Sequence, residues 1–119
     1  MVYTAEHPAL AALEILNGWE VYANLSGYSL YRCTFGAAAV LDAPSDLNVD
    51  DRAATRAFGD AWVRGRASVA LRVRSAAVAE AYNYLLNPDH PDFPKVGLEA
   101  LGPFAFDARV EKLVREAKG

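Results

Sequence analysis

The sequence has 119 residues, a length that fits one domain. It is 53% hydrophobic and 23% charged, so it can bury a core without disulfides or metals, and an intrinsically disordered chain is excluded. A net charge of −3 argues against a protein that binds nucleic acid directly through its phosphates. The single cysteine, Cys33, cannot form an internal disulfide, and no Cys/His cluster has the spacing of a zinc site. These features favour a reducing, cytoplasmic compartment.

No apolar run approaches the roughly 20 residues that are needed to cross a bilayer. Glu6, His7 and Pro8 interrupt the N-terminus before the hydrophobic stretch of a signal peptide can build. We therefore expect one domain over residues 1–119 with no membrane partner.

The first half of the chain mixes strand and helix signals. The predicted elements are a strand over residues 1–4, a helix over 9–17, a strand or hairpin over 21–31, an extended segment over 30–41, a loop over 44–46 and a helix that ends at about residue 64. Pro8 fits the first turn of the first helix, and Gly18 is a typical stop after it. Asp50 or Asp51 is expected to cap the second helix, which Gly59 weakens and could split.

The second half contains the clearest strand. The predicted elements are a strand over 68–74, a short helix or extended segment over 76–86, a turn-rich loop over 87–94, a short strand over 104–106 and a charged helix over 107–118. Within the first of these, Val69, Leu71 and Val73 alternate with Arg72 and Arg74, which is typical of a half-buried strand. Three prolines are expected to exclude regular structure from the loop. The mixture predicts an α+β fold.

Three polar or aromatic residues are candidates for a site. Glu14 shares a helical face with Leu10 and Leu13, where a carboxylate is seldom buried without a partner or a task; the alternative is a carboxylate at the edge of the stripe that reaches solvent. Ser75 continues the apolar face of its strand, and it could equally cap the next turn. Tyr3, at a strand end, could belong to a site or to the core.

Five other residues favour structural interpretations. His7 and His90 each precede a proline in a turn and lack a recognisable triad arrangement, so we expect structural or surface roles. Cys33 reads as a small buried hydrophobe. Arg72 and Arg74 are expected to form a solvated strand face, with anion binding as the minor alternative.

Five segments, in this order, resemble the RES domain family. They are Val2-Tyr3-Thr4-Ala5-Glu6 with Ala9 to Leu16, Thr55 with Phe58 to Trp62, Ala70 to Ala76, Asn83 to Phe93, and Pro103 to Arg109. The run Asn-Tyr-Leu-Leu-Asn-Pro-Asp-His-Pro-Asp-Phe is the most specific of them.

The resemblance implies an ADP-ribosyltransferase-like α+β fold and a toxin of a type II toxin–antitoxin system. Such toxins consume NAD or transfer ADP-ribose by cleaving the nicotinamide–ribose bond, NAD being a substrate and not a resident cofactor, and an Xre-type antitoxin covers their active site. The catalytic glutamate and serine of the family correspond to Glu14 and Ser75, and the aromatic residue near the site corresponds to Tyr3.

The family's arginine lies in a Gly-Arg-Trp-Asn-like segment before the strand that begins here at Met1, and no arginine of this chain matches that motif. The chain is therefore expected to be N-terminally short and to bind NAD weakly. Two further hypotheses stay open: a catalytically inactive remnant that binds an antitoxin, and an unrelated metabolic α+β protein. Pairing of two copies at the N-terminal strand edge is a further option.

Overall fold

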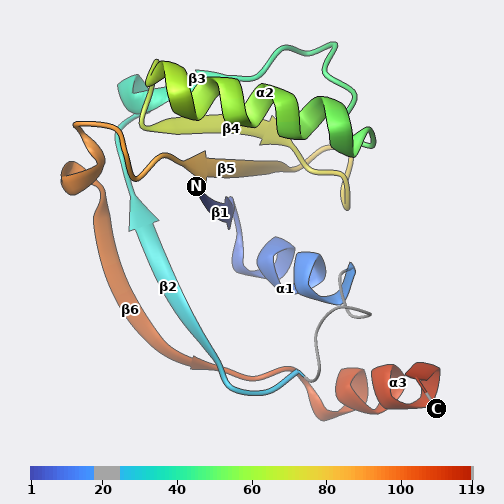
Figure 1. The fold of residues 1–119 in the computed structure, drawn as a ribbon. Helices are drawn as coiled ribbons and strands as arrows, with labels where there is room; N and C mark the ends of the chain where they lie inside the picture. The colour runs from blue at the N-terminus through green and yellow to red at the C-terminus, as the bar shows by residue number, and fades with distance from the viewer. Residues whose placement is uncertain (18–24, 119) are drawn as a thin grey trace.

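A four-stranded sheet carries the fold in the computed structural model, which describes residues 1–17 and 25–118 (Figure 1). The described elements are β1 (Val2–Ala5), α1 (Pro8–Asn17), β2 (Tyr28–Thr34), a 3-10 helix (Ala37–Ala39), β3 (Val40–Asp42), α2 (Arg52–Gly65), β4 (Ala70–Arg74), β5 (Tyr82–Leu86), a second 3-10 helix (Phe93–Lys95), β6 (Gly97–Phe104) and α3 (Ala108–Lys118). The strand order is β1-β5-β4-β3. β5 pairs antiparallel with both β1 and β4, whereas β3 runs parallel to β4 and is joined to it through α2.

A two-stranded arm leaves this sheet. β2 and β6 pair antiparallel over their length and extend away from the sheet, with α3 following at the far end (Figure 1). The ladder has a bulge, because Leu30 pairs with Gly102 while Tyr31 pairs with Ala100. Gly102 adopts a φ of +106°, which side-chain-bearing residues rarely reach, so glycine suits this irregular point.

α2 covers one face of the sheet and is fastened at both ends (Figure 1). The Asp51 side chain accepts a hydrogen bond from the Ala54 backbone N–H (3.1 Å), which satisfies one of the free donors at the start of the helix. Near its other end, the buried Trp62 donates its indole N–H to Ser68 (2.9 Å). Gly59 is buried within an unbroken helix, so it does not split it.

The core joins the sheet to the base of the arm. Val69, Ala70 and Leu86 are buried together, and partly buried residues pack against them, among them Cys33, Phe35, Val40 and Val96. Burial of this apolar surface is the main favourable contribution to folding. Among the helices of the described residues, none is both long and apolar enough to span a bilayer.

The predicted α+β class is confirmed, as are the first strand, the strand ending at Arg74 and all three helices. Of the two alternatives for 76–86, the extended one holds over β5, with a turn before it.

Three local predictions need correction. The extended segment over 30–41 is interrupted by the 3-10 helix at Ala37–Ala39. The proline-rich loop ends in a 3-10 helix that accommodates Pro94 in its first turn. The last strand spans Gly97–Phe104 and not 104–106, because a proline and two glycines obscure its pattern. Residues 18–24, which include Gly18 and part of the predicted 21–31 strand, lie outside the described residues.

Substitution of Asp50 and Asp51 in turn tests which of these two adjacent aspartates caps α2. Replacing Asp51 by Ala should lower the free energy of unfolding by about 1 kcal/mol, because the Ala54 N–H loses its acceptor. Asp50→Ala is the matched control, since the side chain at position 50 makes no capping bond to α2, and it should stay within about 0.5 kcal/mol of the parent protein. Urea unfolding of the two variants measures the difference, and equal losses would contradict the assignment of the cap.

Candidate active site

Ser75 sits directly after β4 and uses its whole hydrogen-bonding capacity. It is 2% exposed, and its backbone N–H donates to the Ala81 carbonyl (2.8 Å), which extends the pairing of β4 with the β5 side of the hairpin. Its hydroxyl donates to Glu14 Oε1 (2.8 Å) and accepts from the backbone N–H groups of Ala77 (3.0 Å) and Val78 (3.1 Å). A serine hydroxyl has one donor and two acceptor lone pairs, so all three are occupied and the direction of the O–H bond is fixed.

The hydrogen bond from Ser75 therefore fixes Glu14, which lies 61 residues earlier in the sequence. It lies on α1, half-buried, one turn after the buried Leu10. Ser75 engages Oε1, and among the described residues no side chain or backbone group donates to Oε2. Sequence reasoning singled out Glu14 and Ser75 separately as polar interruptions of apolar faces, and the structure brings the two into direct contact. The turn-capping alternative for Ser75 also holds, because the same hydroxyl accepts both N–H groups of the turn.

Tyr3 lies within the electrostatic reach of Glu14. Although 59% of this residue is exposed, desolvation of the phenol and, second, the negative charge of Glu14 raise the pKa of Tyr3 to about 12. Tyr3 is thus a neutral phenol at physiological pH, able to donate a hydrogen bond and to offer its ring for stacking.

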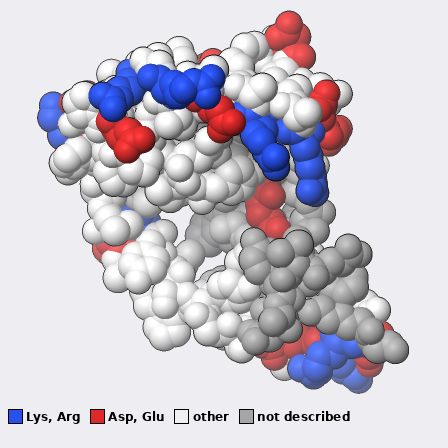
Figure 2. Space-filling view, viewed as in Figure 1, with Lys and Arg blue, Asp and Glu red and all other residues white. Residues whose placement is uncertain are grey.

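A cavity of about 1040 Å³ opens between β1 and the arm, and Tyr3 is part of its wall. Its two sides come from β1 with the start of α1, and from β2 with β6. Figure 2 shows the molecule hollowed between the sheet and the arm. Several large exposed apolar side chains line the cavity, namely Val2, Tyr3, Tyr31, Leu98 and Leu101. Among the described residues that line the cavity, Arg32 is the one with a lysine or arginine side chain. Its guanidinium lies 3.5 Å from the Glu99 carboxylate on the neighbouring strand of the arm.

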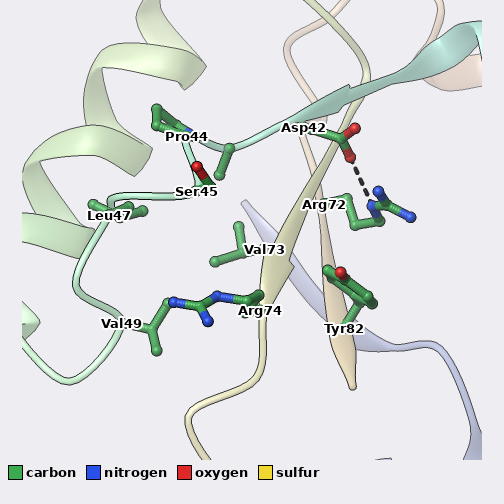
Figure 3. Close-up of a pocket in the computed structure, with 10 residues that line it drawn as sticks. Asp42, Pro44, Ser45, Leu47, Val49, Arg72, Val73, Arg74 and Tyr82 are labelled. Carbon is green, nitrogen blue, oxygen red and sulfur yellow. Dashed lines mark hydrogen bonds and ion pairs between the residues drawn. The ribbon is translucent and has the colours of Figure 1, made fainter. Parts of the chain in front are cut away.

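A smaller cavity of about 200 Å³ lies beside β3 and the end of β4 (Figure 3). The Arg72 guanidinium donates to Asp42 (2.6 Å) and stands over the Tyr82 ring at 4.4 Å, while Arg74 points to the opposite side of the cavity. Arg72 is thus paired with a neighbour and does not line the large cavity, and neither does Arg74. Glu14 and Ser75 line neither of these two cavities, so Tyr3 is the member of the candidate set that connects them to the larger one.

The remaining candidates make local contacts, and two of them, His7 and Cys33, also line the large cavity. The Nδ1 atoms of His7 and His90 each accept a hydrogen bond from the backbone N–H two residues later (3.0 Å in both cases), as turn-forming side chains do. Cys33 is half-buried and packs against the core. Across the described residues, no three His, Cys, Asp or Glu side chains gather in a way that could hold a metal ion.

Asn83, the second residue of β5, belongs to the most specific run of the family resemblance but was not among the predicted site residues. The residue is 1% exposed, and its Oδ1 atom is buried without a hydrogen-bond partner. The available signal was an asparagine inside a run of strand-forming residues, Tyr-Asn-Tyr-Leu-Leu. Such a residue is depleted from strands, but its burial depends on neighbours that are distant in sequence.

The three hydrogen bonds of the Ser75 hydroxyl predict that this side chain stabilises the fold. Ser75→Ala should lower the free energy of unfolding by about 1–3 kcal/mol, because two backbone N–H groups and one carboxylate oxygen lose their partner. Ser45→Ala, at an exposed loop position, is the control and should change the free energy by less than about 0.5 kcal/mol. Denaturant titration of both variants provides the measurement, and a neutral Ser75→Ala would rule out the hydrogen-bond arrangement described.

The pKa of Tyr3 provides a second test. Its phenol should resist deprotonation up to about pH 12, and Glu14→Gln should lower that pKa while leaving it above 10, because burial is the larger cause. Stability should fall as the pH rises from about 10 towards 12, since the unfolded chain releases this proton first. NMR titration of the Tyr3 ring, assigned with Tyr3→Phe, measures the shift. An unchanged pKa in Glu14→Gln would mean that the carboxylate exerts no field at Tyr3.

Comparison with known proteins identifies the family. The family model described as RES domain matches residues 1–107, a range that contains Tyr3, Glu14 and Ser75. A curated relative, the Prs ADP-ribosylating toxin of Sphingobium sp. (strain YBL2), is 31% identical in an alignment 123 residues long. The alignment covers 92% of this chain and 74% of that protein. Both matches agree with the α+β architecture described above, and this chain belongs to the RES domain family.

Proposed function

We propose that this protein is a toxin that consumes NAD by breaking the bond between nicotinamide and ribose. Membership of the RES domain family and the similarity to an ADP-ribosylating toxin support an NAD-related toxin activity. The observation that carries the proposal is the Glu14 carboxylate, which a saturated serine hydroxyl holds in one orientation beside Tyr3.

The proposed chemistry assigns each group a task. As the nicotinamide–ribose bond breaks, its electron pair leaves with nicotinamide and positive charge develops on the ribose ring. The Glu14 carboxylate stabilises that charge, and because Ser75 already orients Oε1, little reorganisation is needed as the charge forms. Water, phosphate or a nucleophilic side chain of a target protein then bonds to the ribose carbon. These acceptors give free ADP-ribose, phosphorylated ADP-ribose or an ADP-ribosylated protein.

The large cavity is our candidate for the body of the NAD molecule. Its volume is sufficient for a ligand of this size, and its mixture of apolar walls with a few polar groups is typical of cofactor and substrate sites. Tyr3 lines the cavity and is influenced by Glu14, so the nicotinamide ribose would lie at this end. Among the described lining residues, Arg32 could bind the pyrophosphate of NAD. Because Arg32 is exposed and already paired with Glu99, we expect it to add only modestly to the affinity for NAD.

An antitoxin protein, of the Xre type implied by the resemblance, is the proposed partner. The exposed apolar side chains that line the cavity support this second proposal, because contiguous apolar surface of this kind marks interaction sites. A chain that bound an antitoxin without consuming NAD would be the inactive remnant considered from the sequence.

Incubation of the purified chain with NAD, with and without phosphate, tests the proposed reaction. Free nicotinamide should appear, and Glu14→Gln should slow its release by about 100-fold or more while the variant keeps an acceptor for Ser75 and unfolds at a similar denaturant concentration. Glu116→Gln, on α3, is the control and should retain the full rate. Chromatography of the products identifies the acceptor. Absence of nicotinamide release by the parent protein, or equal rates for it and Glu14→Gln, would contradict the proposal.

A further inference from the structure

Two buried asparagines at β5 differ in how their polar atoms are satisfied. Asn87 follows the strand, donates Nδ2–H to the Val63 carbonyl (3.1 Å) and accepts at Oδ1 from the Asp89 N–H (3.0 Å). Asn83 donates Nδ2–H to the Thr4 carbonyl (3.2 Å), but its Oδ1 is buried with no partner. A buried acceptor without a donor costs stability, and unsatisfied groups are uncommon in native proteins. Asn83 therefore needs an explanation that Asn87 does not.

Strand register places Asn83 on the same sheet face as Ser75. Asn83 is opposite Ala5 on β1 and Val73 on β4, and the Ser75 N–H bond to Ala81 continues the β4–β5 ladder by one more pair on that face. Directly opposed residues in an antiparallel ladder point to the same face, and diagonal neighbours lie within reach of longer side chains. Asn83 and Ser75 are such diagonal neighbours.

Glu14 interacts with residues of the two strands on either side of β5, the strand that carries Asn83. Its carboxylate accepts a hydrogen bond from Ser75, which follows β4, and its charge acts on Tyr3, which lies on β1. β5 is the strand between β1 and β4, so Asn83 lies on the strand between the two residues that Glu14 bonds to or influences. Tyr3 pairs with Leu85, two residues from Asn83 and on the same face.

Neither Ser75 nor the Glu14 carboxylate has a free donor to offer the Asn83 oxygen. An ionised carboxylate such as Glu14 can only accept hydrogen bonds. The one donor of the Ser75 hydroxyl is already given to Glu14, and its lone pairs are filled by the turn. Two acceptors, Glu14 Oε2 and Asn83 Oδ1, thus lack a donor among the described residues on one face of the sheet.

We propose that Asn83 is a substrate-binding residue, which together with Glu14 accepts the hydrogen bonds of two adjacent hydroxyl groups on a ribose ring. The inference rests on the proposed function and deepens it, because it assigns the ribose cis-diol as the group recognised at this site. A cis-diol supplies two O–H donors on neighbouring carbons, which matches a pair of acceptors. Asn83 lines neither cavity and its Oδ1 is covered, so the proposal places the ribose at the half-exposed Glu14 and requires a local movement that uncovers Oδ1. The ribose then gives Oδ1 the donor that the described residues do not supply.

Deletion of single hydroxyls from the ligand tests this assignment. The probe is carba-nicotinamide riboside, in which a methylene group replaces the ring oxygen so that the glycosidic bond resists cleavage, together with its 2′-deoxy and 3′-deoxy forms. The parent protein should bind both deoxy forms about tenfold more weakly than the diol. Asn83→Leu should weaken the diol about tenfold and no longer distinguish it from one of the two deoxy forms. Asn87→Leu is the matched control and should keep the affinities of the parent protein at temperatures where it is folded.

The outcomes separate this inference from the proposed function. If Asn83→Leu discriminates against both deoxy forms as the parent protein does, Asn83 makes no ribose contact and the inference is wrong, whereas NAD consumption by the parent protein is unaffected. If the parent protein binds none of the ribosides and releases no nicotinamide from NAD, the proposed function fails as well.

A measurement on the parent protein covers the case in which Asn83→Leu does not fold, since that change also removes the bond to Thr4. Addition of the carba-riboside should shift the side-chain amide signals of Asn83 in a ¹H–¹⁵N spectrum, because Oδ1 gains a donor. The amide signals of Asn87 should stay in place. Signals of Asn83 that do not move at saturating ligand would overturn the assignment.

Discussion

The hydrogen bond between Ser75 and Glu14 is the interaction on which the candidate site depends. It joins the end of β4 to α1 across 61 residues of sequence, and the turn after β4 fixes its direction because two backbone N–H groups occupy the lone pairs of the hydroxyl. A free serine could rotate and share its proton among several acceptors, whereas this one can give it only to Glu14. The turn between β4 and β5 thereby sets the orientation of a carboxylate on another element.

The sheet provides the geometry for this arrangement. β5 lies between β1 and β4, so three residues that are distant in sequence share one face of the sheet: Tyr3 on β1, Asn83 on β5 and Ser75 after β4. The bond from Asn83 to the Thr4 carbonyl adds a side-chain tie between β5 and β1. The arm formed by β2 and β6 lies beyond β1 and closes the other side of the large cavity. Preorganised polar groups beside an apolar-walled cavity are the usual arrangement of a small-molecule site.

Local signals in the sequence predicted much of the fold. The sequence predicts Asp50 or Asp51 as the N-terminal cap of α2, and the structure shows that Asp51 is the cap. The alternation around Leu71 predicted β4, although burial in this strand decreases along its length, from the buried Ala70 and Leu71 to the exposed Arg74, and does not differ between its two faces. The strand predicted over 104–106 had the wrong bounds, because β6 contains Gly97, Gly102 and Pro103. These residues weaken a strand pattern but are tolerated at a bulge and in a strand with one partner.

The candidate site was predictable in part. Glu14 and Ser75 each broke an apolar pattern, and the resemblance to the RES domain family linked them before any contact was known. Asn83 could not be found in the same way, because an asparagine in a strand reveals neither its burial nor the satisfaction of its side chain. Both properties arise from strands β1 and β4 on either side, and pairing between distant segments is not encoded in a local pattern.

A crystal structure of the Glu14→Gln variant with NAD would show whether the side chain at position 14 faces the bound ribose. The substitution keeps the acceptor for Ser75 and slows turnover, so intact NAD should remain in the crystal. The nicotinamide ribose should lie next to β5, with its hydroxyls within hydrogen-bond distance of the side chains at positions 14 and 83 and with Tyr3 beside the nicotinamide ring. A nicotinamide ribose bound elsewhere, with the bond between Ser75 and position 14 intact and buried away from the ligand, would contradict it.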